Sequence, residues 1–264
     1  MMSLEMCSFV VDKLRVKIFK YRRALGQAAG EAVAEKMREI LRIQKELFVV
    51  FASAPSQNEF LEELSNSRNV DWKRVTAFHL DEYVGLPDAA PQTFGQYLRK
   101  RLFDKVRPGK IHYLNGMAKD PEAECDRYAA LLKDHPLDIA CIGIGENGHL
   151  AFNDPPVADF NDPRLVKVVE LDLASRQQQV HDGCFKEIES VPQKAITLTL
   201  PAILSATFIF CMVPGPTKEG AVKKTLEGPI TTDCPASILK KHEKATLFLD
   251  QDSAKGISDL RVQI

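Results

Sequence analysis

The sequence has no excess of charge of either sign. Its 264 residues include 35 Lys and Arg and 36 Asp and Glu, which gives a formal net charge of −1 at pH 7. Proteins that bind nucleic acid usually carry a basic balance or a basic patch that contacts the phosphates. The balanced composition gives no such basic footprint, and we therefore expect no nucleic-acid partner.

Long apolar runs are also missing. No run approaches the ~18 consecutive apolar residues that a membrane-spanning helix needs. Residues Met1 to Phe9 lack the basic stretch and long apolar core of a signal peptide. We therefore expect no membrane partner and a cytoplasmic location.

The cysteines lack the spacing of a metal site or a disulfide framework. There are six, none of them paired as Cys-x-x-Cys, and Cys141 and Cys211 lie within apolar segments. Isolated cysteines of this kind behave as small hydrophobic side chains in a reducing compartment. We expect neither a structural metal nor a disulfide scaffold.

The composition does provide a sizeable core, because 45% of the residues are hydrophobic. No repeat or linker divides the chain, and we expect one domain over residues 1–264. Apolar strand-like runs alternate with helical patterns, which predicts a doubly wound, mostly parallel sheet. Strands are expected at 10–20, 47–52, 71–80, 111–114, 137–144, 165–171, 195–200, 207–213 and 246–250, and helices at 22–44, 58–64, 93–106, 121–133, 216–226 and 235–241.

The most informative stretch is residues 137–156. An apolar segment to Ile144 is typical of a strand buried on both faces. Three glycines then alternate with polar residues, namely Glu146, Asn147, His149, Asn153 and Asp154. A tight turn with a surface histidine would also use Gly, Asn and Asp. We favour a functional site, because open α/β sheets build their sites where buried strands end in such loops.

A second strand ends in the same way. Val75 to Leu80 is followed by Asp81 and Glu82 and then by a Gly/Pro turn. Asp81 is a candidate acid–base group, although an Asp at this position could simply cap a turn. For Glu82 we expect a solvated neighbour, because adjacent residues of a strand point to opposite sides.

Two further strand–turn–helix junctions are candidate anion sites. The first is the loop Ser53, Ala54, Pro55 and Ser56, and the second ends at Lys218. The free N–H groups and the dipole at a helix start favour a bound anion. Ser56 would serve equally well as a helix N-cap.

The motifs FHLDEYVGLP and GIGENGHLAFNDP together resemble the glucosamine-6-phosphate deaminase (isomerase) family. This family belongs to a sugar-phosphate isomerase superfamily that also includes 6-phosphogluconolactonase. The resemblance extends from about residue 14 to residue 250. It implies a three-layer α/β/α, Rossmann-like fold and a single catalytic domain. It also implies conversion of glucosamine 6-phosphate to fructose 6-phosphate and ammonia, without cofactor or metal. Whether the chain acts as a homo-oligomer stays open.

The resemblance implies roles for individual residues. Asp81 would carry the proton from C2 to C1, and His149 would open the sugar ring, oriented by Asp154. Better-known members have Asp where this chain has Asn147, and Glu where it has Asp154. Asn147 could only orient a group, so a helper acid would have moved to Glu146 or been dispensed with.

The phosphate and the substrate would be held by a second group of residues. Lys218 matches the family lysine, and Arg176 is a weaker candidate, since its flanking residues match poorly. Two solvated basic residues would be the alternative interpretation. The expected binding residues are Ser53, Ala54, Pro55, Ser56, Gly145, Arg176 and Lys218.

Three competing functions remain. Another amino-sugar phosphate, such as galactosamine 6-phosphate, would suit the same motifs. A 6-phosphogluconolactonase is disfavoured by Tyr83 and by the segment Leu150–Asn153, which differ from the lactonase motifs. A non-catalytic sugar-sensing domain of a repressor would need a DNA-binding module, and the residues ahead of the first helix are too few for one.

Overall fold

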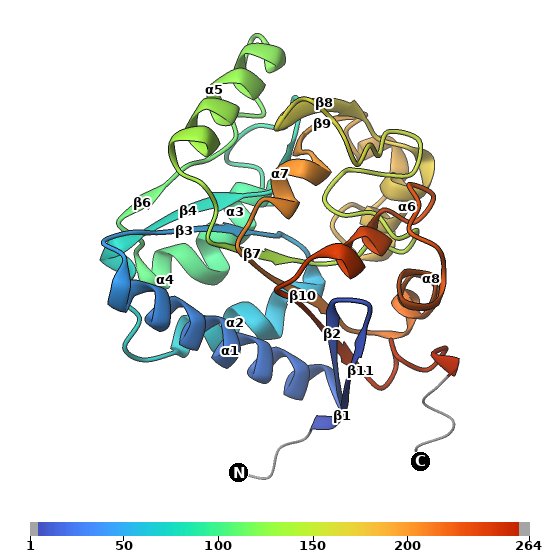
Figure 1. The fold of residues 1–264 in the computed structure, drawn as a ribbon. Coiled ribbons are helices and arrows are strands. Elements are labelled where there is room, and N and C mark those ends of the chain that lie inside the picture. Colours follow the sequence, from blue (N-terminus) through green and yellow to red (C-terminus); the bar gives the residue numbers. More distant parts are fainter. Residues whose placement is uncertain (1–4, 259–264) are drawn as a thin grey trace.

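A computed structural model describes residues 5–258 of the chain (Figure 1). Its centre is an eight-stranded sheet in the order β1-β2-β11-β10-β7-β3-β4-β6. All neighbouring strands are parallel except β1 and β2. The strands are β1 (Glu5–Val11), β2 (Leu14–Phe19), β3 (Leu47–Phe51), β4 (Val75–His79), β6 (Lys110–Ile111), β7 (Ile139–Ile142), β10 (Phe208–Val213) and β11 (Ala245–Asp250). The doubly wound, mostly parallel sheet expected from the sequence is confirmed.

The first strand region differs from the expectation. One strand was predicted over 10–20, whereas the chain forms the antiparallel hairpin β1–β2, which turns at Asp12 and Lys13. Asp12 has φ = 53°. Asp tolerates this left-handed conformation better than most residues, because its short polar side chain bonds locally. The hairpin adds an antiparallel edge to the parallel sheet.

Helices cover both faces of the large sheet and complete three layers (Figure 1). On one face, α1 and α2 pack with strand residues such as Val49 and Met212. On the other face, α5, α7 and α8 pack with strand residues such as Val50 and Val213. The helices are α1 (Arg22–Ile43), α2 (Asn58–Asn66), α3 (Phe94–Leu98), α4 (Asp104–Val106), α5 (Pro121–Asp134), α6 (Leu173–His181), α7 (Leu200–Leu204) and α8 (Glu219–Glu227).

Shorter helical segments adjoin these helices. A π-helical stretch, Arg99–Phe103, joins α3 to α4, so the helix predicted over 93–106 forms with this irregularity. Short 3-10 turns at Pro55–Gln57 and Pro216–Lys218 precede α2 and α8. A 3-10 helix, Pro235–Lys241, follows α8 where a short helix was expected.

A second sheet was not expected from the alternation of strands and helices. It contains β5 (Asp81–Tyr83), β9 (Lys194–Leu198) and β8 (Val166–Glu170), all antiparallel. An aromatic cluster that includes Tyr83, Phe94 and Phe152 packs against it. Because β4 and β5 are separated by Leu80 alone, the chain passes directly from the large sheet into the small one. The candidate residue Asp81 therefore begins the small sheet.

The order of the strands fixes the position of the site. The chain moves outward from β3 through β4 to β6, and then returns to place β7 on the other side of β3. Ligands of open α/β sheets bind beyond the carboxyl ends of the strands at such a reversal. The polar loops after β3, β4, β7 and β10 all meet at this edge.

The expectation that the cysteines are small buried hydrophobic side chains holds for four of the six, because Cys125, Cys141, Cys211 and Cys234 are buried. Cys7 and Cys184 are partly exposed. None of the helices within residues 5–258 combines the length and the apolar character required to span a membrane.

Candidate active site

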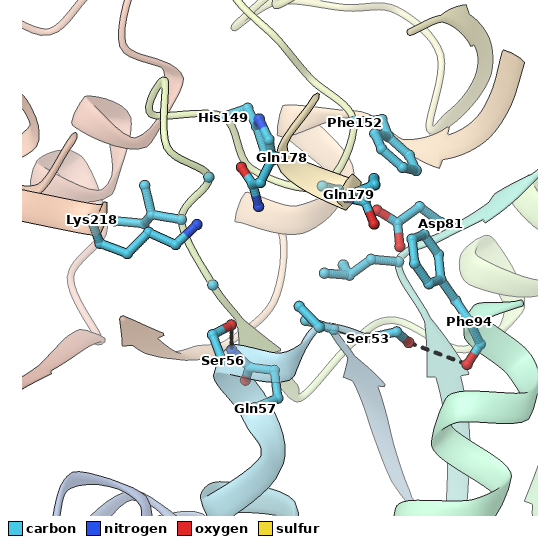
Figure 2. Close-up of a pocket in the computed structure, with 17 residues that line it drawn as sticks. Ser53, Ser56, Gln57, Asp81, Phe94, His149, Phe152, Gln178, Gln179 and Lys218 are labelled. Carbon is cyan, nitrogen blue, oxygen red and sulfur yellow. Dashed lines mark hydrogen bonds between the residues drawn. The ribbon is translucent and has the colours of Figure 1, made fainter. Parts of the chain in front are cut away.

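A cavity of about 520 Å³, including its open mouth, lies at the carboxyl edge of the large sheet (Figure 2). Its lining comes from the loops after β3, β4, β7 and β10 and from helix α6. Among the residues predicted from sequence, Ser53, Ala54, Ser56, Asp81, Gly145, His149 and Lys218 line it. Segments far apart in the chain are thus brought together in one hollow.

Asp81 supplies the acidic side of the cavity. It pairs with Thr197 of β9 and is 8% exposed. Burial raises the pKa of Asp81 well above its usual value, and the neighbouring charge of Glu82 adds to the shift. A carboxyl group with a raised pKa is a stronger base when ionised and exchanges protons nearer neutral pH. Asp81 is therefore suited to moving a proton within a substrate.

Glu82 is not the solvated neighbour that the sequence predicted. It is 4% exposed, and its carboxylate accepts backbone N–H groups of Tyr83, Phe94 and Gly95 at 2.9–3.1 Å. Two of these donors belong to the first turn of α3, whose free N–H groups need acceptors. Burial raises the pKa of Glu82 to about 7, although these hydrogen bonds oppose the shift. Glu82 thus joins β5 to α3 on the side away from Asp81.

His149 and Asp154 form a close pair at the cavity wall. Nδ1 of His149 lies 2.8 Å from Oδ1 of Asp154, an ion-pair distance, although the N–H direction falls short of an aligned hydrogen bond. Burial alone would raise the pKa of Asp154. The charge of His149, together with hydrogen bonds to the carboxylate, outweighs burial and keeps this pKa below its usual value. Asp154 is therefore an ionised partner that can orient the imidazole.

Asn147 connects the two members of this pair. Its Nδ2 donates to Oδ1 of Asp154 at 2.8 Å, and its Oδ1 accepts the backbone N–H of His149 at 3.0 Å. Ser175 of α6 donates its hydroxyl to the same Asp154 oxygen at 3.1 Å. An aspartate at position 147 could not donate to Asp154 when ionised, so the amide suits this arrangement.

Gly145 is required by the position of the imidazole. A Cβ atom at this residue would lie 2.2–2.4 Å from three ring atoms of His149. The ring therefore packs directly on the backbone of the loop after β7. Any side chain here would displace the imidazole.

Lys218 supplies the basic side of the cavity. Figure 2 shows its ammonium group directed toward the centre of the cavity, with Asp81 on the opposite side. Lys218 is 5% exposed, and burial lowers its pKa, partly offset by the charges of Asp182 and Glu146. Ser53, Ala54 and Ser56 also line the cavity, and their loop leads into the 3-10 turn that precedes α2. An ammonium group beside a helix start is an arrangement that attracts a phosphate.

Helix α6 adds residues that the sequence reasoning missed. Gln178 and Gln179 line the cavity, and Ser175 reaches Asp154. Gln178 also accepts the backbone N–H of Glu146 at 2.9 Å. Residues spaced by three and four share one face of a helix. That spacing of polar residues, 175, 178 and 179, was the available signal. Phe94 and Gln57 also line the cavity and had no sequence signal of their own, whereas Phe152 lies within the motif GIGENGHLAFNDP but was given no role in the site.

The structure corrects the prediction for Arg176. Its guanidinium group donates to the backbone carbonyls of Ile188 and Val191 at 2.6 and 3.2 Å. Arg176 does not line the cavity, and these carbonyls hold its guanidinium group beside the segment that follows α6. Arg176 therefore holds the segment after α6 in place and is not positioned to bind a phosphate.

Two other predicted residues lie beside the cavity wall. Among residues 5–258, the carboxylate of Glu146 contacts Nδ1 of His181 at 3.6 Å, rather than His149. It is therefore not placed as a helper acid for His149. Pro55 begins the 3-10 turn, and its carbonyl accepts a hydrogen bond from Arg22. Pro55 shapes the loop while its neighbours face the cavity.

Fold and site together define a three-layer α/β protein whose cavity has a basic, anion-attracting side and a carboxyl group on the opposite side. Residues 20–248 match the sequence model of the family described as glucosamine-6-phosphate isomerases/6-phosphogluconolactonase. The chain belongs to this family.

Several relatives carry the name glucosamine-6-phosphate deaminase. The chain is 34% identical over 242 residues to one from Lactobacillus delbrueckii subsp. bulgaricus, covering 91% of this chain and 98% of the relative. It is 36% identical over 222 residues to one from Exiguobacterium sibiricum, covering 84% and 86%.

Solved structures of other proteins share the fold of this chain. A monomeric glucosamine-6-phosphate deaminase superposes with a TM-score of 0.84 at 32% identity, covering 91% of this chain and 99% of the other. A 6-phosphogluconolactonase from Thermotoga maritima superposes with a TM-score of 0.74 at 20% identity, covering 90% and 100%. The second likeness bears on the fold alone.

Proposed function

We propose that this protein converts glucosamine 6-phosphate and water into fructose 6-phosphate and ammonia. The observation that carries the proposal is the opposition of Asp81 and Lys218 across one cavity (Figure 2), together with the His149–Asp154 pair at its wall. The identity to relatives named as deaminases, over most of both chains, supports the same reaction.

The phosphate occupies the basic side in this proposal. Lys218 and the loop Ser53–Ser56 hold the phosphate. The phosphate dianion provides the negative counter-charge for the buried ammonium group of Lys218. Binding the phosphate away from the reacting carbons orients them and lowers the entropic part of the barrier. Gln178 and Gln179 face the sugar between the two sides of the cavity.

The reaction then needs three steps. His149, held by Asp154, moves a proton between the ring oxygen and the C1 hydroxyl, which opens the sugar ring. Asp81 takes the proton from C2 and returns it to C1, while O1 gains a proton and the nitrogen loses one, which converts the amino aldehyde into an imine at C2 with a hydroxyl group at C1. Water adds to this imine, and ammonia leaves with the proton that it needs, so the products balance. Each proton transfer by a positioned side chain is worth about 10²–10⁴-fold in rate.

The test is to incubate the purified protein with glucosamine 6-phosphate and to measure ammonia and fructose 6-phosphate together. We expect equal amounts of the two products. In Asp81→Asn, kcat should fall by about 10³-fold, because the amide cannot accept the C2 proton. In Lys218→Met, KM should rise by about 100-fold, because a charge-assisted contact to the phosphate is lost.

Lys224→Met is the matched control, because Lys224 is an exposed lysine of α8, the helix that directly follows Lys218. Its KM should equal that of the wild type. Turnover that survives in Asp81→Asn would contradict the assigned base. A protein inactive on glucosamine 6-phosphate but active on galactosamine 6-phosphate or 6-phosphogluconolactone would overturn the proposed substrate.

A further inference from the structure

His79 is a buried histidine that touches Asp81 without lining the cavity. It ends β4 and has no exposed surface. Its Nδ1 lies 2.9 Å from the backbone carbonyl oxygen of Asp81, and its Nε2 lies 2.9 Å from the backbone nitrogen of Leu114. Both ring nitrogens are therefore used, each by a different segment of the chain.

The partners fix the protonation of this ring. A carbonyl oxygen only accepts, so Nδ1 must carry the proton. A backbone N–H only donates, so Nε2 must be bare. A doubly protonated ring would set an N–H against the N–H of Leu114. Burial lowers the pKa of His79 to about 4, which agrees with a neutral ring, although a hydrogen bond to Asp81 and the charge of Glu124 favour the cation.

The carbonyl of Asp81 needs such a partner because of the strand pairing. The backbone carbonyl of Leu80 accepts the N–H of Leu198, and the N–H of Val84 donates to the backbone carbonyl of Lys194. These backbone groups of Leu80 and Val84 therefore face β9. In an antiparallel pair, backbone groups alternate between facing the partner strand and facing away. The carbonyl of Asp81 therefore faces away from β9, and His79 supplies the donor that the sheet does not.

His79 is itself held from a third direction. The hydroxyl of Tyr128, on α5, accepts the backbone N–H of His79 at 3.0 Å and lies 3.1 Å from its carbonyl oxygen. Phe78, the preceding residue, packs edge-on against the same tyrosine ring. The backbone of His79 is thus anchored to the large sheet and to α5, while its ring binds the first residue of the small sheet.

We propose that His79 is a positioning residue, whose neutral imidazole fixes the backbone of Asp81, and thereby its carboxylate, at the junction of the two sheets. The inference rests on the deaminase function proposed above. A carboxylate that must serve both C2 and C1 needs a fixed position, because a displacement of about 1 Å can cost 10²-fold in rate.

The test compares two conservative substitutions that each keep one half of the contact. In His79→Asn the amide nitrogen lies near the position of Nδ1 and can still donate to Asp81. In His79→Gln the amide extends to the position of Nε2 and can still accept from Leu114. We expect kcat to fall by about 100-fold in His79→Gln and far less in His79→Asn, with KM unchanged in both.

His112→Asn is the control for stability. His112 is a neighbouring histidine with a lowered pKa that stacks on Phe78, and its backbone also contacts Tyr128. Thermal unfolding of all three variants is measured beside kcat. If kcat falls in proportion to thermal stability in all three variants, including His112→Asn, then His79 has only a structural role. That result would overturn the proposal.

An NMR measurement separates this inference from the proposed function. Long-range ¹H–¹⁵N correlations of the wild type at pH 7 should give a neutral His79 protonated at Nδ1, whatever the substrate proves to be. A ring protonated at Nε2, or at both nitrogens, would overturn the positioning role. Absence of turnover on glucosamine 6-phosphate with the Nδ1–H form present would count against the proposed function alone.

Discussion

His79 and Glu82 change the stability of this protein in opposite directions as the pH changes. Burial lowers the pKa of His79 to about 4 and raises that of Glu82 to about 7. Between pH 4 and 6.5 the unfolded chain binds a proton on His79 that the folded protein does not, so stability rises with pH. Between pH 4.5 and 7 the folded protein holds a proton on Glu82 that the unfolded chain releases, so stability falls with pH.

We therefore predict that single substitutions will separate two effects that partly cancel in the wild type. From pH 5 to pH 8, the wild type should gain about 2 kcal/mol in unfolding free energy relative to His79→Asn. Over the same range it should lose about 2 kcal/mol relative to Glu82→Gln. Denaturant unfolding at several pH values measures both differences. Parallel pH curves for the wild type and His79→Asn would contradict the neutral buried ring.

The sequence signal at individual residues was strongest where a side chain follows a buried strand. Asp81 and His149 follow β4 and β7, and both line the cavity as expected. Glu82 and Arg176 were misread because their partners come from elsewhere. The first turn of α3 binds Glu82, and the carbonyls of Ile188 and Val191 bind Arg176. A linear pattern does not contain such contacts.

Among the secondary-structure elements, α1 and α2 pack closely enough to require glycine. A Cβ atom on Gly26 would lie 2.4 Å from Cβ of Glu59 and 2.8–2.9 Å from the α2 backbone. Gly30, one turn later, would meet Glu63 at 2.7 Å. Glycine destabilises a helix interior relative to alanine, so its presence here reflects the contact between the two helices.

This contact gives opposite predictions for two glycine-to-alanine substitutions in helices. Gly26→Ala should destabilise the protein by about 1–3 kcal/mol, because overpacking exceeds the gain in helix propensity. Gly220→Ala, in α8, meets nothing within 4 Å and should stabilise by about 0.5–1 kcal/mol. Chemical denaturation of both variants provides the comparison. If both substitutions change the free energy of unfolding in the same direction, the α1–α2 contact can accommodate a methyl group.

At the scale of the whole molecule, residues associated with both sheets line the same cavity. Asp81 belongs to the small sheet, whereas Lys218 follows β10 of the large one. A substrate that touches both residues would therefore bind across the junction of the sheets. Neither sheet by itself holds a complete site, and the single domain over residues 1–264 stays a prediction.

We predict that the two sheets unfold together. The chain has one tryptophan, Trp72, and it lies in the cluster under α1 and α2, away from the aromatic cluster of the small sheet. Val169→Ala removes buried groups from the small-sheet cluster and should cost roughly 2 kcal/mol. Trp72 fluorescence should report this loss with the same midpoint as far-UV circular dichroism. An unchanged Trp72 midpoint would mean that the small sheet unfolds separately.

Local patterns in the sequence predicted the alternation of strands and helices, the layered α/β architecture and the two polar loops that carry Asp81 and His149. Those features depend on local periodicity and on short motifs, both of which are written in consecutive residues. No local pattern predicted that β5, β8 and β9 form an antiparallel sheet, that α6 faces the cavity, or that His79 binds the backbone of Asp81, and these features emerge in the folded protein. These depend on contacts between segments distant in the chain, where packing selects one partner from many that local pattern allows.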